Sequence, residues 1–353
     1  MRRHTHENNF RMNTPPWNSR IAVVIPCYKV APFLPKVLAS IGPEVSAIYC
    51  VIDGCEMGSD RAAMAAVAND ARIVVVKHDI NQGVGQAFIT GCQLALEHGA
   101  DIVVKLDGDG QMDPSDILRL VEPLQMGHAD YTKGNRFFHL EDLQSMPIVR
   151  MFGNAVLSFF SKLSTGYWNI FDPTNGFIAI HSNIAKRMPW TKLHRRYFFE
   201  SDMLFRLYTL RAVVVDVPMK ARYGMEKSNL SILAAMVQFP IFHGLNFAKR
   251  IFYGYFLREF NIASLNLILS LGLIGFGTCF GGFNWVRGNE LNQLASAGTV
   301  MFAALPIILG WQALLSFFAF DVGNVPRTPQ RWRLMASTSN ETAFQQAPKN
   351  ESE

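Results

Sequence analysis

The sequence has few cysteines and no closely spaced pair of them. Only 5 of its 353 residues are Cys, an odd number, and no two have the C-x-x-C spacing typical of zinc and redox sites. A disulfide framework usually uses an even number of cysteines in an oxidising compartment. We therefore expect reduced thiols, with no disulfide and no zinc.

Two common binding signatures are missing as well. The formal net charge is only +5 and no block of Lys and Arg occurs, so no nucleic-acid partner is expected. The segment Asn81 to Ala87 has Gly83 and Gly85 but lacks the third glycine of a dinucleotide fingerprint, and it follows the third expected strand instead of the first. A dehydrogenase of the Rossmann class is not expected either.

Charged residues are absent from two long stretches near the end of the chain. Residues 260–286 and 291–320 contain no Asp, Glu, Lys or Arg. About 20 apolar residues suffice to cross a hydrocarbon core of about 30 Å. We predict two transmembrane helices, from Ile262 to Phe283 and from Ala297 to Phe320; a pair of buried core helices is the alternative.

Basic residues flank the predicted hairpin on both outer sides, whereas its connecting loop has only Arg287 against Glu290. By the positive-inside rule, both flanks are cytosolic. The first 20 residues are polar and lack an apolar run, so no signal peptide is expected. This predicts a multi-pass protein of the cytoplasmic (inner) membrane, with the large N-terminal part and both termini in the cytosol. The flanking basic residues are Lys249, Arg250, Arg258, Arg327, Arg331 and Arg333.

Short β-branched runs alternate with helical stretches in the first part of the chain. Such alternation predicts an α/β doubly wound, mostly parallel sheet. Expected strands are Ile21 to Ile25, ended by Pro26, Ser46 to Asp53, Arg72 to Lys77, Asp101 to Leu106 and Ala212 to Val217. Expected helices are Pro32 to Ile41, Arg61 to Ala68 and Gly85 to His98.

Polar residues collect after these strands, where the carboxyl ends of a parallel sheet form a crevice. Asp107 and Asp109 are separated by one glycine directly after an apolar strand. Like charges so close repel each other, and Mg²⁺ or Mn²⁺, which binds carboxylate and phosphate oxygens, would relieve that repulsion. The turn therefore predicts a metal bridge to a diphosphate; a solvated acidic turn is the alternative.

Four motifs resemble, in order and spacing, those of family 2 inverting glycosyltransferases with a GT-A fold. They are Val23-Val-Ile-Pro-Cys-Tyr28, Val51-Ile-Asp-Gly54, Asn81-Gln-Gly-Val-Gly-Gln-Ala87 and Lys105-Leu-Asp-Gly-Asp-Gly-Gln111. Further segments resemble the polyprenyl-phosphate branch of that family, which includes enzymes similar to dolichyl-phosphate mannose synthase. These are Lys133-Gly-Asn-Arg136, Arg150, Asp172-Pro-Thr-Asn-Gly-Phe177 and Val217 to Lys227, so that the resemblance covers residues 20–230.

The resemblance implies a nucleotide-sugar donor and a place for each part of it. Pro26 and Tyr28 would lie beside the base, Asp53 on uracil or guanine, and Gly83 in the nucleotide-sugar loop. The metal, Mg²⁺ or Mn²⁺, and the diphosphate would be held by Asp107, Asp109 and Gln111.

The resemblance also implies four basic residues that face phosphate groups. Arg binds a phosphate bidentately and Lys acts as a point charge, so such a cluster near a membrane suits a polyprenyl-phosphate acceptor. Surface charge is the alternative for each of them. The residues are Arg136, Arg150, Arg222 and Lys227.

The acidic segment Tyr197 to Arg206 departs from the lipid-phosphate pattern. A phosphate acceptor is already ionised, whereas a hydroxyl acceptor needs a base. Glu200 and Asp202 resemble the residues that supply this base in hydroxyl-accepting relatives, and Asp172, in a turn-forming loop, is another candidate. The alternatives are a structural pairing of Glu200 and Asp202 with Arg195, Arg196 or Arg206, and an Asx turn at Asp172.

These observations predict a membrane-anchored glycosyltransferase that moves a sugar from a UDP- or GDP-sugar to undecaprenyl or dolichyl phosphate. Transfer to a hydroxyl of a lipid-linked glycan is the second hypothesis, and a non-catalytic membrane scaffold is the third. A homo-oligomer is compatible with the sequence. The expected parts are a tail (1–20), the GT-A domain (21–228), amphipathic helices on the membrane surface (229–259), the transmembrane hairpin (260–320) and a cytosolic tail (321–353), disordered from Thr328 onward.

Overall fold

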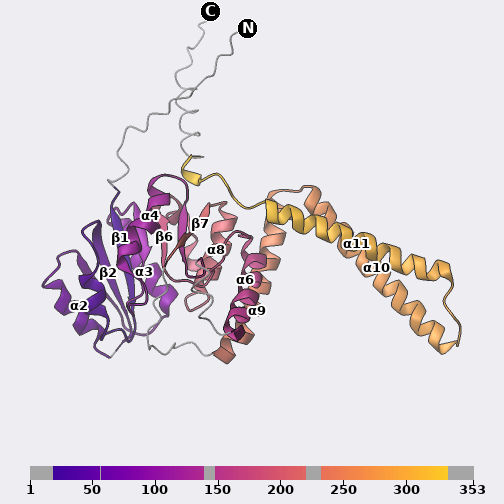
Figure 1. The fold of residues 1–353 in the computed structure, drawn as a ribbon, viewed down its shortest axis with the longest axis horizontal. Helices are drawn as coiled ribbons and strands as arrows, with labels where there is room; N and C mark the ends of the chain where they lie inside the picture. The colour runs from indigo at the N-terminus through magenta and orange to yellow at the C-terminus, as the bar shows by residue number, and fades with distance from the viewer. Residues whose placement is uncertain (1–18, 56, 139–147, 220–231, 333–353) are drawn as a thin grey trace, which may run out of the picture.

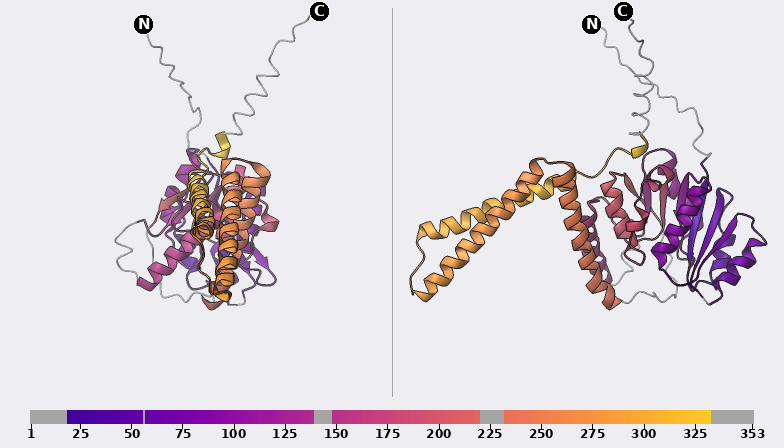
Figure 2. Two further views of the ribbon diagram at one scale, coloured as in Figure 1. Left: turned by 90° about the vertical axis from the view of Figure 1, so that its right-hand side faces the viewer. Right: turned by 180° about the vertical axis from the view of Figure 1, so that it is seen from behind.

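The computed structural model describes residues 19–55, 57–138, 148–219 and 232–332. These residues form an α/β/α domain from which a helical hairpin projects (Figure 1). Figure 1 and the right view of Figure 2 show the hairpin leaving the side of the domain that carries α6 (Ile148–Thr165) and α9 (Ile232–Phe252).

A seven-stranded sheet of order β3-β2-β1-β4-β6-β5-β7 forms the centre of the domain. Its paired strands are parallel except β6, which runs antiparallel to both β4 and β5. The expected doubly wound, mostly parallel sheet is therefore confirmed. The strands are β1 (Ile21–Cys27), β2 (Val45–Asp53), β3 (Ile73–His78), β4 (Ile102–Lys105), β5 (Tyr131–Asn135), β6 (Ile178–His181) and β7 (Val214–Pro218).

The alternating side chains of the central strands pack into two apolar cores, one on each face of the sheet. Ile21, Val23 and Ile25 of β1 pack with α1, α2 and α4, whereas Ala22 and Val24 pack with α3 and α8. Burial on both faces explains why these strands are apolar runs without polar alternation. The elements on the two faces are α1 (Leu34–Ala39), α2 (Ser59–Val67), α3 (Val84–Glu97), α4 (Ile117–Gln125), α7 (Ser182–Ala185) and α8 (Phe199–Thr209), with the short 3-10 turns η1 (Pro114–Asp116) and η2 (Trp190–Lys192).

Pro26 does not end β1, contrary to the sequence prediction. It pairs in register with Val51 of β2, and the strand continues to Cys27. On the other side of β1, the carbonyl of Val24 accepts a hydrogen bond from Leu106 N at 3.0 Å. Pro26 faces the same side two residues later, beyond the end of β4, so its missing N–H removes no bond of the ladder.

The two long C-terminal helices are exposed to solvent along most of their length. Helix α10 (Ile262–Glu290) and helix α11 (Ala297–Gly323) are long and apolar enough to cross a membrane. In the most apolar 18-residue stretch of each helix, 22% and 17% is buried against the rest of the chain. Large apolar side chains such as Phe276, Trp311 and Leu315 point outward. The alternative of two buried core helices is therefore wrong.

A buried ion pair fastens the hairpin to the domain. Asp321, near the end of α11, accepts two hydrogen bonds from Arg250 of α9 at 2.6 and 2.9 Å. It also accepts from Tyr255 Oη at 2.6 Å and from Trp168 Nε1 at 2.9 Å. Arg250 donates further to the carbonyl of Leu163 in α6. Four segments of the chain thus meet at one carboxylate. One of them is the π-helical turn η3 (Tyr253–Arg258), which contains Tyr255 and leads toward α10.

The residues that follow α11 return to the domain. The backbone N–H of Gln330 donates to the Asp130 carboxylate at 2.9 and 3.0 Å, and Trp332 Nε1 donates to the carbonyl of Gly127 at 2.8 Å. The expectation of disorder from Thr328 onward is therefore wrong for residues 328–332. Residues 333–353 lie outside the described part of the chain.

His243 makes the packing of α9 sensitive to acid. Its Nδ1 lies 2.7 Å from Ser164 Oγ of α6, and burial lowers its pKa to about 4. In the unfolded chain His243 binds a proton near pH 6.5, whereas in the folded chain it does not. The contribution of neutral His243 to the free energy of unfolding is therefore complete above pH 6.5 and is lost as the pH falls toward 4. Between pH 7.5 and pH 5 the wild type should lose about 2 kcal/mol of unfolding free energy through His243. We expect His243→Gln to lack this loss, because glutamine does not titrate.

Denaturation of the full chain in detergent at the two pH values measures this effect. His128 is exposed, and His128→Gln is the matched control, which should keep the pH dependence of the wild type. An unchanged pH dependence in His243→Gln would contradict the prediction.

Candidate active site

The carboxyl edge of the sheet brings together most of the predicted site residues. Asp53 ends β2, Asp107 follows β4, and Arg136 follows β5. Strand β6 runs in the opposite direction, with Ile178 paired to Lys105, so the loop that precedes β6 lies at this same edge. Asp172 thereby comes within reach of residues that follow β5.

Asp107 and Asp109 lie in the turn directly after β4. Lys105, the last residue of β4, donates from Nζ to Asp107 Oδ1 at 2.5 Å and to the carbonyl of Gly176 at 3.3 Å. Asp109 Oδ1 accepts from the backbone N–H of Gln111 at 3.0 Å. Burial, together with the charge of Asp107, raises the pKa of Asp109. Burial is the larger cause, and the second cause, repulsion from Asp107, is the one that a divalent cation would relieve.

Two buried lysines at this edge were given no role in the sequence analysis. Lys133 of β5 donates to the carbonyl of Asn175, and burial lowers its pKa to about 8 against the opposing charges of Glu200 and Asp172. Burial also acts to lower the pKa of Lys105, but the charges of Asp107 and Glu200 outweigh it and the pKa is raised. The available signal was a lysine inside the apolar strand Ile102-Val-Val-Lys-Leu106.

Glu200 lies in the first turn of α8, close to both lysines. Burial raises its pKa to about 7, although the charges of Lys105 and Lys133 act to lower it. A carboxyl group whose pKa is near the working pH is suited to accept or donate a proton. Glu200 therefore combines a place at the site with the proton affinity of a base.

Asp202 and Asp172 are both engaged by arginines. Asp202 Oδ2 accepts from Arg206 Nε at 3.1 Å and Nη2 at 3.0 Å, and its Oδ1 accepts from Asn246 at 3.2 Å. This geometry favours the structural alternative for Asp202. Asp172 is fully buried and accepts from Nε and Nη2 of Arg136 at 2.7 and 2.9 Å. Asp172 and Arg136, predicted in separate roles, thus form one bidentate unit.

Asp53 is bound by the loop that follows β3. Its two carboxylate oxygens accept from the backbone N–H groups of Gln82 and Gly83 at 2.9 and 2.8 Å, and His78 Nδ1 lies 2.8 Å away. Gly83 has a φ of +100°, and a Cβ there would lie 2.5 Å from the carbonyl oxygen of Arg195. Asp53 and Gly83 therefore shape this loop, and their contact with a nucleotide stays a prediction.

Of the other residues predicted to bind the base or phosphates, Pro26 and Tyr28 lie within the described part of the chain. Pro26 is buried within β1, and the ammonium of Lys29 lies 5.1 Å from the centre of the Tyr28 ring. The side chain of Arg150 and the whole of Arg222 and Lys227 lie outside the described residues. Their roles stay predictions.

Comparison with known proteins identifies curated relatives over half of the chain. The chain is 33% identical over 178 residues to the UDP-N-acetylglucosamine–dolichyl-phosphate N-acetylglucosaminyltransferase of Methanococcus voltae, an alignment that covers 50% of this chain and 70% of the relative. It is 28% identical over 202 residues to the undecaprenyl-phosphate mannosyltransferase of Micrococcus luteus, over 56% of this chain and 82% of the relative.

Solved structures support the fold at lower sequence identity. The glucosyl-3-phosphoglycerate synthase of Mycobacterium tuberculosis superimposes with a TM-score of 0.51 and 18% identity, over 66% of this chain and 80% of that one. The family model for glycosyl transferase family 2 matches residues 22–188, which contain β1 to β6 and the Asp107 to Asp109 turn. Together with the archaeal relative, this match shows that the chain belongs to glycosyltransferase family 2.

Proposed function

We propose that this protein transfers a sugar from a UDP- or GDP-sugar to the phosphate of a polyprenyl phosphate, such as undecaprenyl or dolichyl phosphate. The supporting observation is the position of Arg136 beside an apolar surface. Phe171, next to Asp172, is exposed, and its carbonyl accepts from Ser158 of α6 at 3.1 Å. Helix α6 carries further exposed phenylalanines, Phe159 and Phe160. A guanidinium next to an apolar helix face suits a phosphate carried on an apolar chain.

The relatives support the same acceptor class. Two of them are named for transfer to dolichyl phosphate and to undecaprenyl phosphate, and a third is the polyprenol monophosphomannose synthase of Mycolicibacterium smegmatis. The exposed hairpin α10–α11 would place the enzyme where such lipids are found.

We assign Asp107 and Asp109 as ligands of Mg²⁺ or Mn²⁺, with Gln111 beside them. No cluster of three or more His, Cys, Asp or Glu that could hold a metal occurs in the described residues, so the remaining ligands would be diphosphate oxygens and water. Glucosyl-3-phosphoglycerate synthase, which shares the fold, has been solved with Mn²⁺ and UDP. When bound, the metal would neutralise charge on the leaving nucleoside diphosphate.

The roles of the remaining donor residues rest on their resemblance to the family motifs. Pro26, Tyr28, Asp53 and Gly83 would border the nucleoside. An oxygen of the acceptor phosphate then attacks the anomeric carbon from the side opposite the diphosphate. One C–O bond to the acceptor forms, the C–O bond to the nucleoside diphosphate breaks, and the configuration inverts. No proton has to be removed, since the phosphate is already ionised.

Transfer to a hydroxyl of a lipid-linked glycan is the second candidate function. The pKa of about 7 at Glu200 favours it, because a hydroxyl must lose its proton during attack. Glu200 would then be the base, while the ion-paired Asp172 and Asp202 would orient Arg136 and α8.

The hairpin also suggests an arrangement on the membrane. In Figure 1, α6 and α9 run steeply across the direction of α10 and α11. If the hairpin spans the bilayer, α9 lies along its surface, with Val237, Ile241 and Leu245 exposed at four-residue spacing. The domain 21–228 and both termini would then lie on the cytosolic side of the inner membrane.

Asp109→Asn tests the metal site. We expect it to lower transfer by at least about 10²-fold and to abolish the Mn²⁺ dependence of UDP or GDP binding, because one charged metal ligand is lost. Calorimetry of nucleotide binding with and without Mn²⁺ measures the second effect. Asp116→Asn, which removes a carboxylate paired with Arg119 outside the site, is the control and should behave as wild type. If Asp109→Asn keeps both sugar transfer and Mn²⁺-dependent nucleotide binding, the assignment is refuted.

The product and the Glu200→Gln variant together identify the acceptor. Membranes containing the enzyme are given labelled nucleotide sugars with undecaprenyl phosphate. A phosphate acceptor predicts a sugar released by mild acid and a Glu200→Gln activity within about tenfold of wild type, because no base is needed. A hydroxyl acceptor predicts an acid-stable glycoside and a loss of about 10² to 10⁴-fold in Glu200→Gln.

A further inference from the structure

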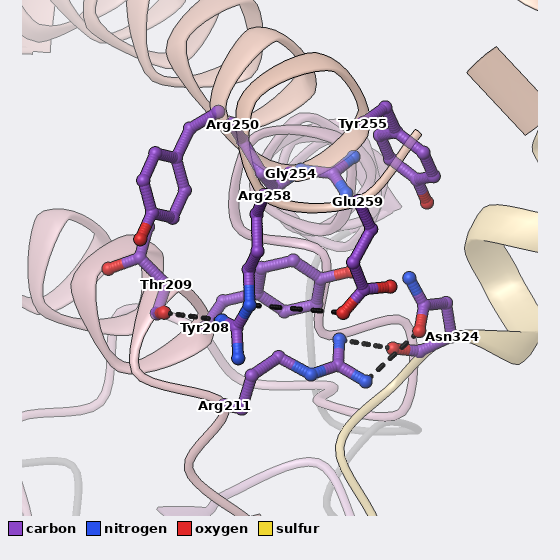
Figure 3. Close-up of a pocket in the computed structure, with 10 residues that line it drawn as sticks. Tyr208, Thr209, Arg211, Arg250, Gly254, Tyr255, Arg258, Glu259 and Asn324 are labelled. Carbon is purple, nitrogen blue, oxygen red and sulfur yellow. Dashed lines mark hydrogen bonds and ion pairs between the residues drawn. The ribbon is translucent and has the colours of Figure 1, made fainter. Parts of the chain in front are cut away.

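A pocket lies where the hairpin joins the domain, away from the active site (Figure 3). Its walls come from the end of α8, the turn η3 and Asn324 just after α11. Thr209 on its rim is at the opposite end of α8 from Glu200, about 14 Å away along the helix axis at 1.5 Å per residue. A ligand bound here would therefore not reach the reacting atoms.

Three arginines and one carboxylate, Glu259, line this pocket. Arg250 is paired with the buried Asp321. Arg211 donates only to neutral oxygens, the carbonyl and side-chain oxygens of Asn324 at 2.9 and 3.0 Å, and no carboxylate within the described residues forms an ion pair with it. Arg258 donates to the carbonyl of Thr209 at 2.9 Å, and within the described residues it forms one ion pair, with the half-exposed Glu259 at 3.8 Å. The pocket therefore carries an excess of positive charge.

Arg211 directly follows Leu210, the C-cap of α8, and its backbone closes the end of that helix. Its φ is +57°, in the left-handed region that glycine or asparagine occupies at lower cost. The guanidinium lies over the Tyr208 ring at 5.5 Å and points into the pocket, toward Asn324. The helix end thus directs this guanidinium into the pocket.

The apolar residues around the pocket indicate what kind of molecule would carry this anion. Leu257, Phe260 and Ile262 flank Arg258 along the chain, and all three are more than half exposed, at 65%, 62% and 61%. They stand at the start of α10, the level at which a membrane-spanning hairpin enters the bilayer. Guanidinium groups next to exposed apolar side chains match a lipid whose phosphate meets the arginines and whose acyl chains cover the apolar residues.

We propose that this pocket binds the headgroup phosphate of an acidic glycerophospholipid of the membrane in which the hairpin is anchored. Arg211 and Arg258 bind the phosphate, Arg250 and Asp321 hold the rear wall, and Leu257 and Phe260 contact the acyl chains. The bound lipid bridges the domain, through Thr209 and Arg211, to the hairpin, through Arg258 and Asn324. It thereby fixes the angle between the two.

The double variant R211Q/R258Q tests this site in the full chain. Native mass spectrometry in detergent, titrated with phosphatidylglycerol or phosphatidylcholine, gives the affinity for each lipid. We expect the wild type to prefer phosphatidylglycerol and the double variant to bind it about tenfold more weakly, because two charge-assisted contacts are lost. Arg258→Lys keeps the charge and should stay within a few-fold of wild type.

A second double variant, R119Q/R287Q, removes two exposed arginines elsewhere and should bind phosphatidylglycerol as the wild type does. Equal weakening in the two double variants would show a general attraction to negative charge and overturn the proposal. Two other results would also overturn it: inorganic phosphate that displaces the lipid at millimolar concentration, or undecaprenyl phosphate bound here in preference to phosphatidylglycerol. The melting temperature of R211Q/R258Q in phosphatidylcholine nanodiscs separates loss of binding from loss of folding.

Discussion

The ammonium groups of Lys105 and Lys133 are buried at the carboxyl ends of β4 and β5, and buried charges of this kind must be matched by nearby acceptors. Carbonyls at the start of β6 supply part of the match through Asn175 and Gly176. Carboxylates supply the rest, since Asp107 binds Lys105 directly and Glu200 acts on both lysines. A Cβ at Gly176 would lie 2.5 Å from Lys105 Nζ, so any larger residue there would displace the ammonium from its present position. The reversed strand, the turn from Asp107 to Asp109 and α8 are thus held together by the need to balance two cations.

That several of the predicted donor-site residues lie at one edge was predictable, because the carboxyl ends of parallel strands meet at the same edge of a sheet. Parallel strands β1 to β4 place Tyr28, Asp53 and Asp107 there once their boundaries are known. The reversal of β6 was not predictable, since a strand as short as Ile178–His181 carries no sign of its direction. Pairings followed from that reversal, such as Arg136 with Asp172, 36 residues away. The sequence offered both residues as candidates but not their bidentate contact.

In the helical hairpin α10–α11, composition predicted the two helices, whereas tertiary packing determines how the hairpin is joined to the domain. The predicted spans begin where α10 and α11 begin, at Ile262 and Ala297, but the helices continue past the predicted ends, to Glu290 and Gly323. The sequence pattern gave Asp321 no role, and it marked Arg250 only as a cytosolic flanking charge. In the folded chain both are buried and bind each other, so neither faces water. Arg258, another flanking charge eight positions after Arg250, stays partly exposed. Whether a basic residue near a span meets lipid or protein depends on tertiary contacts, which hydropathy does not contain.

The electrostatics of Glu200 connect the two acceptor hypotheses to one another. With a pKa of about 7, its carboxyl group exists in both protonation states at neutral pH. A phosphate acceptor brings further negative charge into the site, and like charge favours the protonated form. Glu200 would then be neutral and would donate a hydrogen bond to the phosphate instead of repelling it. A hydroxyl acceptor brings no charge, so that Glu200 would have to be ionised in order to remove the proton. The same buried carboxyl therefore suits either acceptor, and the identity of the acceptor determines which of its two protonation states is the active one.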